Sequence, residues 1–202
     1  MEIKMNTEKK FKIGIDLDDV VFEFVRYLSD YLDRNHGVKV GFEDFISYKF
    51  SDFLDFTNEE MINIIGNMIS NSKNLEYDIC EGAVESIKEL SVNSDIYFIT
   101  SRVHLDGTEE SLEKLFFDID YELIVSSNPY VGNKGRDKGE ICLDLGIDYM
   151  IEDSYEHVLS CLEKGIKCFL INKPWNLNYI ENKKIIRVNS WNEILEVLKN
   201  VE

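Results

Sequence analysis

The stretch KFKIGIDLDDVVFEF, residues 10–24, decides how the rest of the chain is interpreted. An apolar, β-prone run ends abruptly at three carboxylates, Asp16, Asp18 and Asp19, and a second apolar run follows them directly. Carboxylates placed between two core-like segments repel one another and resist burial. A stable fold therefore requires a partner that offsets this charge.

The composition is that of a globular protein, and 202 residues suffice for one sizeable core or for a core with a small inserted subdomain. The formal net charge of −17, from 39 acidic and 22 basic residues, argues against a nucleic-acid duplex or a membrane surface as partner. No apolar run could span a bilayer, and the first ten residues lack the apolar stretch of a secretory signal, so we expect a cytoplasmic protein. The four cysteines form no CxxC pair, which predicts reduced thiols. The oligomeric state stays open, with a homodimer as one alternative.

Strand-like apolar runs alternate with helix-like segments along most of the chain. The runs lie at residues 11–16, 95–100, 121–126, 148–153, 166–171 and 184–188. This alternation predicts βαβ units and an α/β, Rossmann-like fold, with a mostly parallel sheet covered by helices on both faces. Helix starts are predicted at Thr108, as a cap, and at Ser190, which forms a capping-box pattern with Glu193.

Residues 21–92 interrupt the alternation, because they contain no convincing strand. Thr57 and Glu60 form a capping-box pattern, and an apolar stripe with helical spacing follows them. We therefore predict a small helical cap inserted after the first strand, with a core built from residues 1–20 and 93–202. The stripe is expected to form the cap's own core. Aromatic residues that precede it either join that core or line a pocket, and the pattern leaves both open.

Polar side chains follow three of the predicted strands. The first strand ends at Asp16, the second at Thr100 and Ser101, and the fourth at Glu152 and Asp153. In open parallel sheets, ligands bind beyond the carboxyl ends of the strands. Carboxylate oxygens at such an edge suit Mg²⁺, and this ion would relieve the repulsion between the acids.

A lysine before a helix-like segment, Lys138, is predicted to add a positive group at the same edge, although Lys134 in the same loop is an open alternative. Each residue has an ordinary interpretation when taken alone. An Asp after a strand often forms a turn or caps a helix, which is the role we expect for Asp19. Arg102 either contacts substrate or pairs with a surface acid. The ordered set of acid pair, Thr, Lys and second acid pair favours a functional site.

These segments resemble the four motifs of the haloacid dehalogenase superfamily of phosphohydrolases. DLDDV, at residues 16–20, is similar to the DxDx[TV] motif, and FITSR, at residues 98–102, to the second motif. Lys138 matches the third motif, and MIEDS, at residues 150–154, the fourth. The segments EGAVESIKEL, LINKPWN and SWNEILEVL resemble the 5′(3′)-deoxyribonucleotidase-like branch. Members carry a helical cap after the first motif, which agrees with the predicted insertion.

The resemblance implies a Mg²⁺-dependent phosphomonoester hydrolase. Asp16 would be the nucleophile that forms an aspartyl-phosphate, and Asp18 would protonate the leaving group and then deprotonate water. Mg²⁺ would be held by Asp16, by the backbone carbonyl of Asp18 and by Asp153. Glu152 would either be a further Mg²⁺ ligand or accept hydrogen bonds from the groups that surround the ligands.

The same resemblance assigns phosphate binding to Thr100, Ser101 and Lys138, with Thr100 and Lys138 also counted as catalytic. It favours (deoxy)ribonucleoside monophosphates as substrates, which would make the protein a 5′-nucleotidase. A phosphatase for a sugar phosphate or another small phosphometabolite is the alternative. A third interpretation is a module that binds phosphate or a metal without turnover. The presence of every catalytic residue type argues against it.

Overall fold

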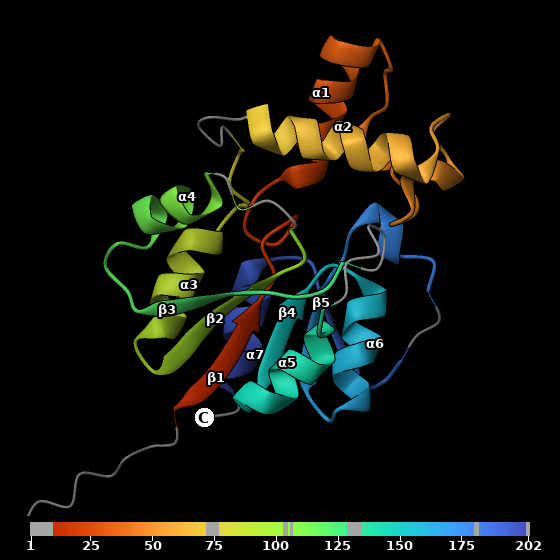
Figure 1. Ribbon diagram of the computed structural model, residues 1–202. Helices are drawn as coiled ribbons and strands as arrows, with labels where there is room; N and C mark the ends of the chain where they lie inside the picture. The colour runs from red at the N-terminus through yellow and green to blue at the C-terminus, as the bar shows by residue number, and fades with distance from the viewer. Residues whose placement is uncertain are drawn as a thin grey trace, which may run out of the picture.

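The computed structural model describes residues 10–71, 77–102, 105, 107–128, 135–179 and 182–200. Within this part of the chain the strands form a six-stranded parallel sheet in the order β3-β2-β1-β4-β5-β6 (Figure 1). The strands are β1 (Phe11–Ile15), β2 (Ser94–Thr100), β3 (Tyr121–Val125), β4 (Tyr149–Glu152), β5 (Lys167–Ile171) and β6 (Ile185–Val188). The predicted α/β, Rossmann-like fold is confirmed, and each predicted strand lies within a residue or two of its expected bounds.

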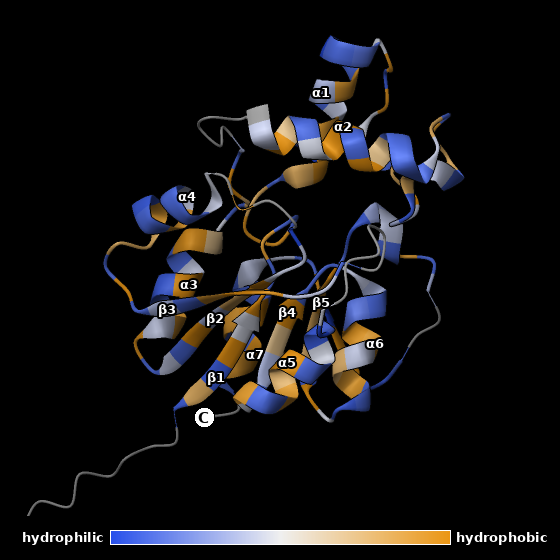
Figure 2. Cartoon of the chain, viewed as in Figure 1, coloured by the Kyte–Doolittle hydropathy of each residue, from blue (hydrophilic) through white to orange (hydrophobic). Residues whose placement is uncertain are grey.

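Helices cover both faces of this sheet. One face carries α3 (Ala83–Ser91), α4 (Thr108–Leu115) and α7 (Trp191–Lys199), and the other carries α5 (Lys138–Leu145) and α6 (Tyr155–Glu163). Because side chains alternate along a strand, Phe98 of β2 joins the larger apolar core under α3, α4 and α7, whereas Tyr97 and Ile99 join the smaller core under α5 and α6. Figure 2 shows the resulting pattern of apolar strands and two-sided helices.

A second group of helices follows β1 and lies beyond the carboxyl ends of the strands (Figure 1). It contains α1 (Phe24–His36), the 3₁₀ helices η1 (Phe42–Asp44) and η2 (Phe50–Asp52), and α2 (Asn58–Asn71). α2 contacts both α1 and η2. The division at residues 20 and 92 stays a prediction, and α3, which precedes residue 92, packs against β2 and α7.

Two of the three predicted capping residues lie at the N-cap of their helix. The Thr57–Glu60 capping box is present at the start of α2, since each residue's backbone N–H donates to the other's side chain. Ser190 caps α7 as predicted, because its hydroxyl accepts the backbone N–H of Glu193, but the Glu193 carboxylate accepts the backbone N–H of Asn189 and so does not complete the predicted box. The prediction that Thr108 caps α4 is wrong, because Gly107 occupies the N-cap position and the Thr108 hydroxyl instead accepts a hydrogen bond from Arg102.

Two predictions from composition concern the cysteines and the membrane. All four cysteines are buried and free, in agreement with the prediction of reduced thiols. Among the residues that the structure describes, no helix combines the length and apolar character needed to cross a membrane.

Candidate active site

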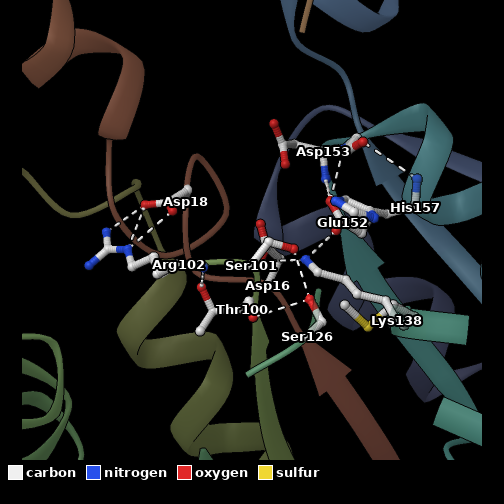
Figure 3. A network of polar contacts seen from close by, with 12 residues as sticks. Asp16, Asp18, Thr100, Ser101, Arg102, Ser126, Lys138, Glu152, Asp153 and His157 are labelled. Atoms are coloured by element: carbon white, nitrogen blue, oxygen red, sulfur yellow. Dashed lines mark hydrogen bonds and ion pairs between the residues drawn. The ribbon is translucent and has the colours of Figure 1, made fainter. Parts of the chain in front are cut away.

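The site forms where three adjacent strands end. β1 pairs with β2 on one side and with β4 on the other, so the residues that follow these strands meet at one edge. Asp16 comes directly after β1, and its backbone N–H donates to the carbonyl of Ile151 at 3.0 Å, which fixes it beside β4. Thr100 ends β2 and Glu152 ends β4. The acids that the sequence places at one edge therefore lie together, as Figure 3 shows.

Lys138 bridges the two acidic strand ends. Its Nζ donates to Asp16 Oδ1 at 2.6 Å and to Glu152 Oε1 at 2.5 Å, and the side chain is almost fully buried. Lys138 is the first residue of α5, whose N-cap is Asp137. A Cβ on the next residue, Gly139, would lie 2.4 Å from the Ser160 carbonyl oxygen. This glycine thus permits the close contact of α5 with α6 beside the lysine. The alternative, Lys134, lies outside the described residues.

The charges of this cluster depend on one another. Burial raises the pKa of Asp16 to about 7, although the ammonium of Lys138 opposes the rise. Burial alone would lower the pKa of Lys138, but the carboxylates of Asp16 and Glu152 outweigh it and hold that pKa above its ordinary value. Lys138 is therefore a fixed positive charge beside the proposed nucleophile.

Glu152 and Asp153, the second acid pair, differ in how many of their carboxylate oxygens accept hydrogen bonds. Glu152 Oε2 accepts the backbone N–H groups of Asp153 and Ser154 at 2.7 and 2.8 Å, so both oxygens of Glu152 are engaged once Lys138 is counted. Asp153 Oδ2 accepts the indole N–H of Trp175 at 2.8 Å. Asp153 Oδ1 is buried and has no hydrogen-bond partner among the described residues.

These residues fit a divalent cation. Asp16, Glu152 and Asp153 each offer a carboxylate oxygen, and these oxygens lie within 4.8 Å of one another. Burial and the charges of Glu152 and Asp16 raise the pKa of Asp153 well above its usual range, so a positive ligand would be needed to keep this carboxylate ionised. The orphaned Oδ1 of Asp153 supplies a ready acceptor. Asp18 is not part of this carboxylate group, and the role of its backbone carbonyl stays a prediction.

Asp18 is paired with Arg102. The guanidinium donates from Nε to Oδ1 and Oδ2 at 3.0 and 3.1 Å, and from Nη2 to Oδ1 at 2.5 Å. In Figure 3 the Asp18 carboxylate points toward Arg102 and away from Lys138. Arg102 is buried, with its guanidinium 5.3 Å from the ring centre of Phe22 and 5.0 Å from that of Tyr77. It therefore pairs with an acid of the site itself and not with a surface acid.

The remaining predicted residues have separate surroundings. Asp19 lies in a turn with a left-handed φ of 57°, as predicted, and its carboxylate accepts the backbone N–H of Val25 in the first turn of α1, although Glu23 occupies the N-cap position. Thr100 is fully buried, and its hydroxyl accepts the backbone N–H of Arg102. Ser101 lines a cavity, and its hydroxyl shares a 2.8 Å hydrogen bond with that of Ser126.

This cavity, of about 260 Å³, lies between the strand ends and α2. Its polar end contains Asp16, Asp18, Ser101, Lys138 and Asp153, and its apolar wall contains Met61, Ile62, Ile65 and Ile69 of α2. The prediction that the stripe forms a core of its own is wrong, because Met61, Ile64, Met68 and Ile69 belong to the larger apolar core that also lies under α3, α4 and α7, and some members of the stripe face the cavity as well. The aromatic residues take both of the roles left open: Tyr48 and Phe50 line the cavity, and Phe50 also packs with Phe45 and Phe53 in one aromatic group.

Two cavity-lining residues of functional interest, His157 and Trp175, were not predicted from the sequence, and for Arg102 neither of the two predicted roles was pairing with Asp18. Arg102 lies 84 residues from Asp18 in the chain, and no spacing rule links the two. His157 is on the first turn of α6, four residues after Asp153, and faces Tyr48 with their ring centres 6.5 Å apart. The NKPWN segment indicated only a family resemblance, which gave no hint that Trp175 contacts an acid.

No family model matches the sequence. A curated protein of Oceanobacillus iheyensis named "Putative nucleotidase OB0422" is 21% identical over 189 residues, which cover 92% of this chain and 97% of that protein. A haloacid dehalogenase-like family hydrolase from Streptococcus pneumoniae has a similar structure, with a TM-score of 0.64, 17% identity and coverage of 94% of this chain and 98% of that one. The chain has the haloacid dehalogenase fold. A magnesium-bound haloacid dehalogenase-type hydrolase from Bacillus subtilis is also similar, with a TM-score of 0.58, 14% identity and coverage of 94% and 99%.

Proposed function

We propose that the protein is a Mg²⁺-dependent phosphomonoester hydrolase that acts through an aspartyl-phosphate on Asp16. One observation carries the proposal: at the polar end of a cavity, a buried lysine bridges Asp16 and Glu152, and beside them Asp153 has a buried oxygen without a hydrogen-bond partner among the described residues. This arrangement combines a carboxylate nucleophile, a fixed positive charge and a cation site. The haloacid dehalogenase fold and the named nucleotidase relative support the same conclusion.

Asp16 is the proposed nucleophile. Lys138 holds its Oδ1, so we assign the attack on phosphorus to Oδ2. The bond from phosphorus to the leaving oxygen breaks as the bond to Asp16 forms, and water later displaces Asp16 to release inorganic phosphate. Lys138 also neutralises charge that develops on the phosphoryl oxygens. Ser101, which lines the cavity, and Thr100 are the further proposed phosphate-binding residues.

Asp18 is the proposed general acid and base. It would donate a proton to the leaving alkoxide in the first step and accept a proton from the attacking water in the second. Arg102 fixes its carboxylate in the present structure, so the residue must either act from this position or turn toward Asp16.

Asp16 and Asp153 would hold Mg²⁺, with Glu152 positioned to orient Lys138 and the backbone of Asp153 and Ser154. The bound cation would supply positive charge that offsets the repulsion between a carboxylate and a phosphate dianion.

Nucleoside monophosphates are the proposed substrate class, which would make the protein a 5′-nucleotidase. The cavity wall formed by α2 is apolar, and the aromatic residues Tyr48 and Phe50 also line the cavity. A flat, weakly polar nucleobase suits such a wall better than a polyhydroxyl sugar does, because buried sugar hydroxyls require hydrogen-bond partners. The nucleotidase name of the Oceanobacillus relative supports this choice.

A panel of phosphomonoesters, measured with and without Mg²⁺, tests the proposal. It contains p-nitrophenyl phosphate, dUMP, dTMP and several sugar phosphates. We expect Mg²⁺-dependent phosphate release, loss of that release in Asp16→Asn, and a higher kcat/KM for the nucleotides. Asp144→Asn is the matched control, since it removes one carboxylate from an exposed position of α5 and should leave activity unchanged.

Two results would contradict parts of the proposal separately. Absence of hydrolysis across the whole panel would exclude the phosphatase function. A higher kcat/KM for sugar phosphates would retain the phosphatase and replace the nucleotide by a sugar phosphate as the substrate class.

A further inference from the structure

Trp175 connects the second acid pair with the helical group beyond the strand ends. Its indole N–H donates to Asp153 Oδ2 at 2.8 Å. Its ring contacts Phe42 of η1 edge to face, with ring centres 5.5 Å apart and ring planes at 70°. Only 4% of Trp175 is exposed, so this large side chain lies between the two parts of the molecule and not on its surface.

The backbone around Trp175 is held firmly. Trp175 belongs to the 3₁₀ helix η3 (Pro174–Asn176), which follows β5. The side-chain amide of Asn176 donates to the carbonyls of Asp153 and Ile171 at 2.8 and 2.7 Å. Arg187 in turn donates to the Asn176 carbonyl at 2.8 Å. The indole thus approaches Asp153 from a segment that is itself tied to Asp153.

An indole N–H is a donor only, so it holds one carboxylate oxygen and leaves the other for a different partner. In Asp153 that other oxygen is Oδ1, the buried atom that lacks a hydrogen-bond partner among the described residues. Because Oδ2 is fixed, the carboxylate cannot rotate freely, and its orientation beside Asp16 and Glu152 is set in advance. Groups that hold metal ligands in this way commonly control metal affinity.

We propose that Trp175 is a positioning residue that orients Asp153 for a divalent cation, with the Phe42 contact holding the indole in place. The inference rests on the proposed function, because it requires a cation at Asp16 and Asp153. It assigns Trp175 a role that burial alone would not give, since a residue that only fills the core needs no hydrogen bond to a ligand carboxylate.

Mg²⁺ titration by calorimetry, without substrate, tests this inference. Trp175→Phe keeps an aromatic ring at this position and removes the N–H that reaches Asp153, together with part of the indole ring system. We expect Mg²⁺ affinity to fall roughly 10- to 100-fold, the range found when groups behind metal ligands are removed. Trp191→Phe is the matched control, because Trp191 is equally buried and its N–H donates to a backbone carbonyl, that of Val20, and not to one of the proposed ligand carboxylates. Its Mg²⁺ affinity should match that of the wild type.

A second measurement keeps Trp175 intact, in case Trp175→Phe does not fold. The chain contains two tryptophans, so in Trp191→Phe all tryptophan fluorescence comes from Trp175. We expect Mg²⁺ to shift this emission, because the cation binds the carboxylate to which the indole donates.

The outcomes separate the inference from the function on which it rests. Equal Mg²⁺ affinity in the wild type and in Trp175→Phe would overturn only the role of Trp175. The same holds if calorimetry shows Mg²⁺ binding and the fluorescence emission of Trp175 does not change. Absence of Mg²⁺ binding to the wild type overturns the cation site of the proposed function instead.

Discussion

Arg102 holds the carboxylate of Asp18 through two of its nitrogens, with Nε 3.0 Å and Nη2 2.5 Å from Oδ1. The guanidinium also donates to the Thr108 hydroxyl at 2.9 Å and lies against two aromatic rings. Burial alone would lower the pKa of Arg102, but the charge of Asp18 outweighs this and raises it above its ordinary value. The proposed acid and base of the reaction is thus controlled by a residue that remains charged.

Replacing Arg102 by Lys should slow the reaction in a way that depends on the leaving group. A lysine cannot reproduce the planar, two-nitrogen contact with Asp18. General acid catalysis contributes about 10²- to 10⁴-fold, so we expect kcat for alkyl phosphates to fall at least about tenfold. For p-nitrophenyl phosphate, whose leaving group needs little protonation, the fall should be smaller. An equal loss on both substrates would contradict this role.

Arg136→Lys is the control for that comparison. Arg136 is exposed and pairs with Asp144 on the surface of α5, so the same exchange there should change neither substrate's kcat. Thermal unfolding of both variants would show whether a loss of activity in Arg102→Lys reflects a loss of folded protein.

Replacing Lys138 by Met should strongly destabilise the protein in the absence of Mg²⁺. The variant leaves Asp16 and Glu152 buried without their shared cation, and breaking a buried ion pair in this way typically costs about 3–5 kcal/mol. Urea unfolding at pH 8 measures the effect, and added Mg²⁺ should restore part of the stability. Lys134→Met, the same exchange nearby in the sequence, is the matched control. A larger effect from Lys134→Met would reverse the assignment of the lysine.

His157 should give the protein a distinctive dependence of stability on pH. Burial lowers its pKa to about 4 from an ordinary value of 6.5. Between these pH values the unfolded chain binds a proton that the folded chain does not, so this residue lowers the free energy of unfolding as the pH falls from 7 toward 4. The stability of the wild type relative to His157→Gln should therefore decrease over that range.

Comparison with the variant is needed because Asp16 acts in the opposite direction. With a pKa raised to about 7, folded Asp16 keeps a proton that the unfolded chain releases, which stabilises the fold as the pH falls below 7. This contribution is present in both proteins, so their difference removes most of it and retains the part that comes from the interaction of Asp16 with His157. His36→Gln, at an exposed position, is the control. A difference between wild type and His157→Gln that stays constant from pH 7 to pH 5 would contradict the buried, neutral state of His157.

Gly66 offers a test of the cavity. It lies within α2 on the cavity wall, and a Cβ placed on it meets no atom within 4 Å. Gly66→Ala should raise the free energy of unfolding by about 0.5–1 kcal/mol, because alanine favours a helix more than glycine does. Gly66→Leu should fill part of the cavity and raise KM for nucleoside monophosphates more than for p-nitrophenyl phosphate. An unchanged KM ratio would show that the leaving group lies elsewhere.

The sheet and the position of the acids were predictable from the sequence because they depend on local patterns. Apolar runs of strand length specify the strands, and the end of each run specifies which side chains reach the carboxyl edge. Asp16, Thr100 and Glu152 could therefore be placed at that edge from the pattern of residues alone. The turn role of Asp19 followed in the same way from its place between a strand and a helix.

The contacts that complete the site were not predictable, because they join residues far apart in the chain through side-chain packing. Arg102 could equally have faced substrate or solvent, and only the positions of Phe22 and Tyr77 explain why its guanidinium is buried beside Asp18. Trp175 lies in η3, which follows β5, and from this position its indole N–H donates to Asp153, 22 residues away in the chain. Thr108 has a sequence context typical of a helix cap, yet its hydroxyl accepts a hydrogen bond from Arg102.

The most direct test of the account is chemical trapping of the proposed intermediate. The protein would be mixed with Mg²⁺ and a phosphomonoester that it hydrolyses, quenched in acid, and treated with borohydride, which reduces an aspartyl-phosphate to homoserine. Peptide mass spectrometry should then find homoserine at position 16 and nowhere else, and only when substrate is present. Turnover without any reduction at Asp16, or reduction at another carboxylate, would contradict the assignment of Asp16 as the nucleophile.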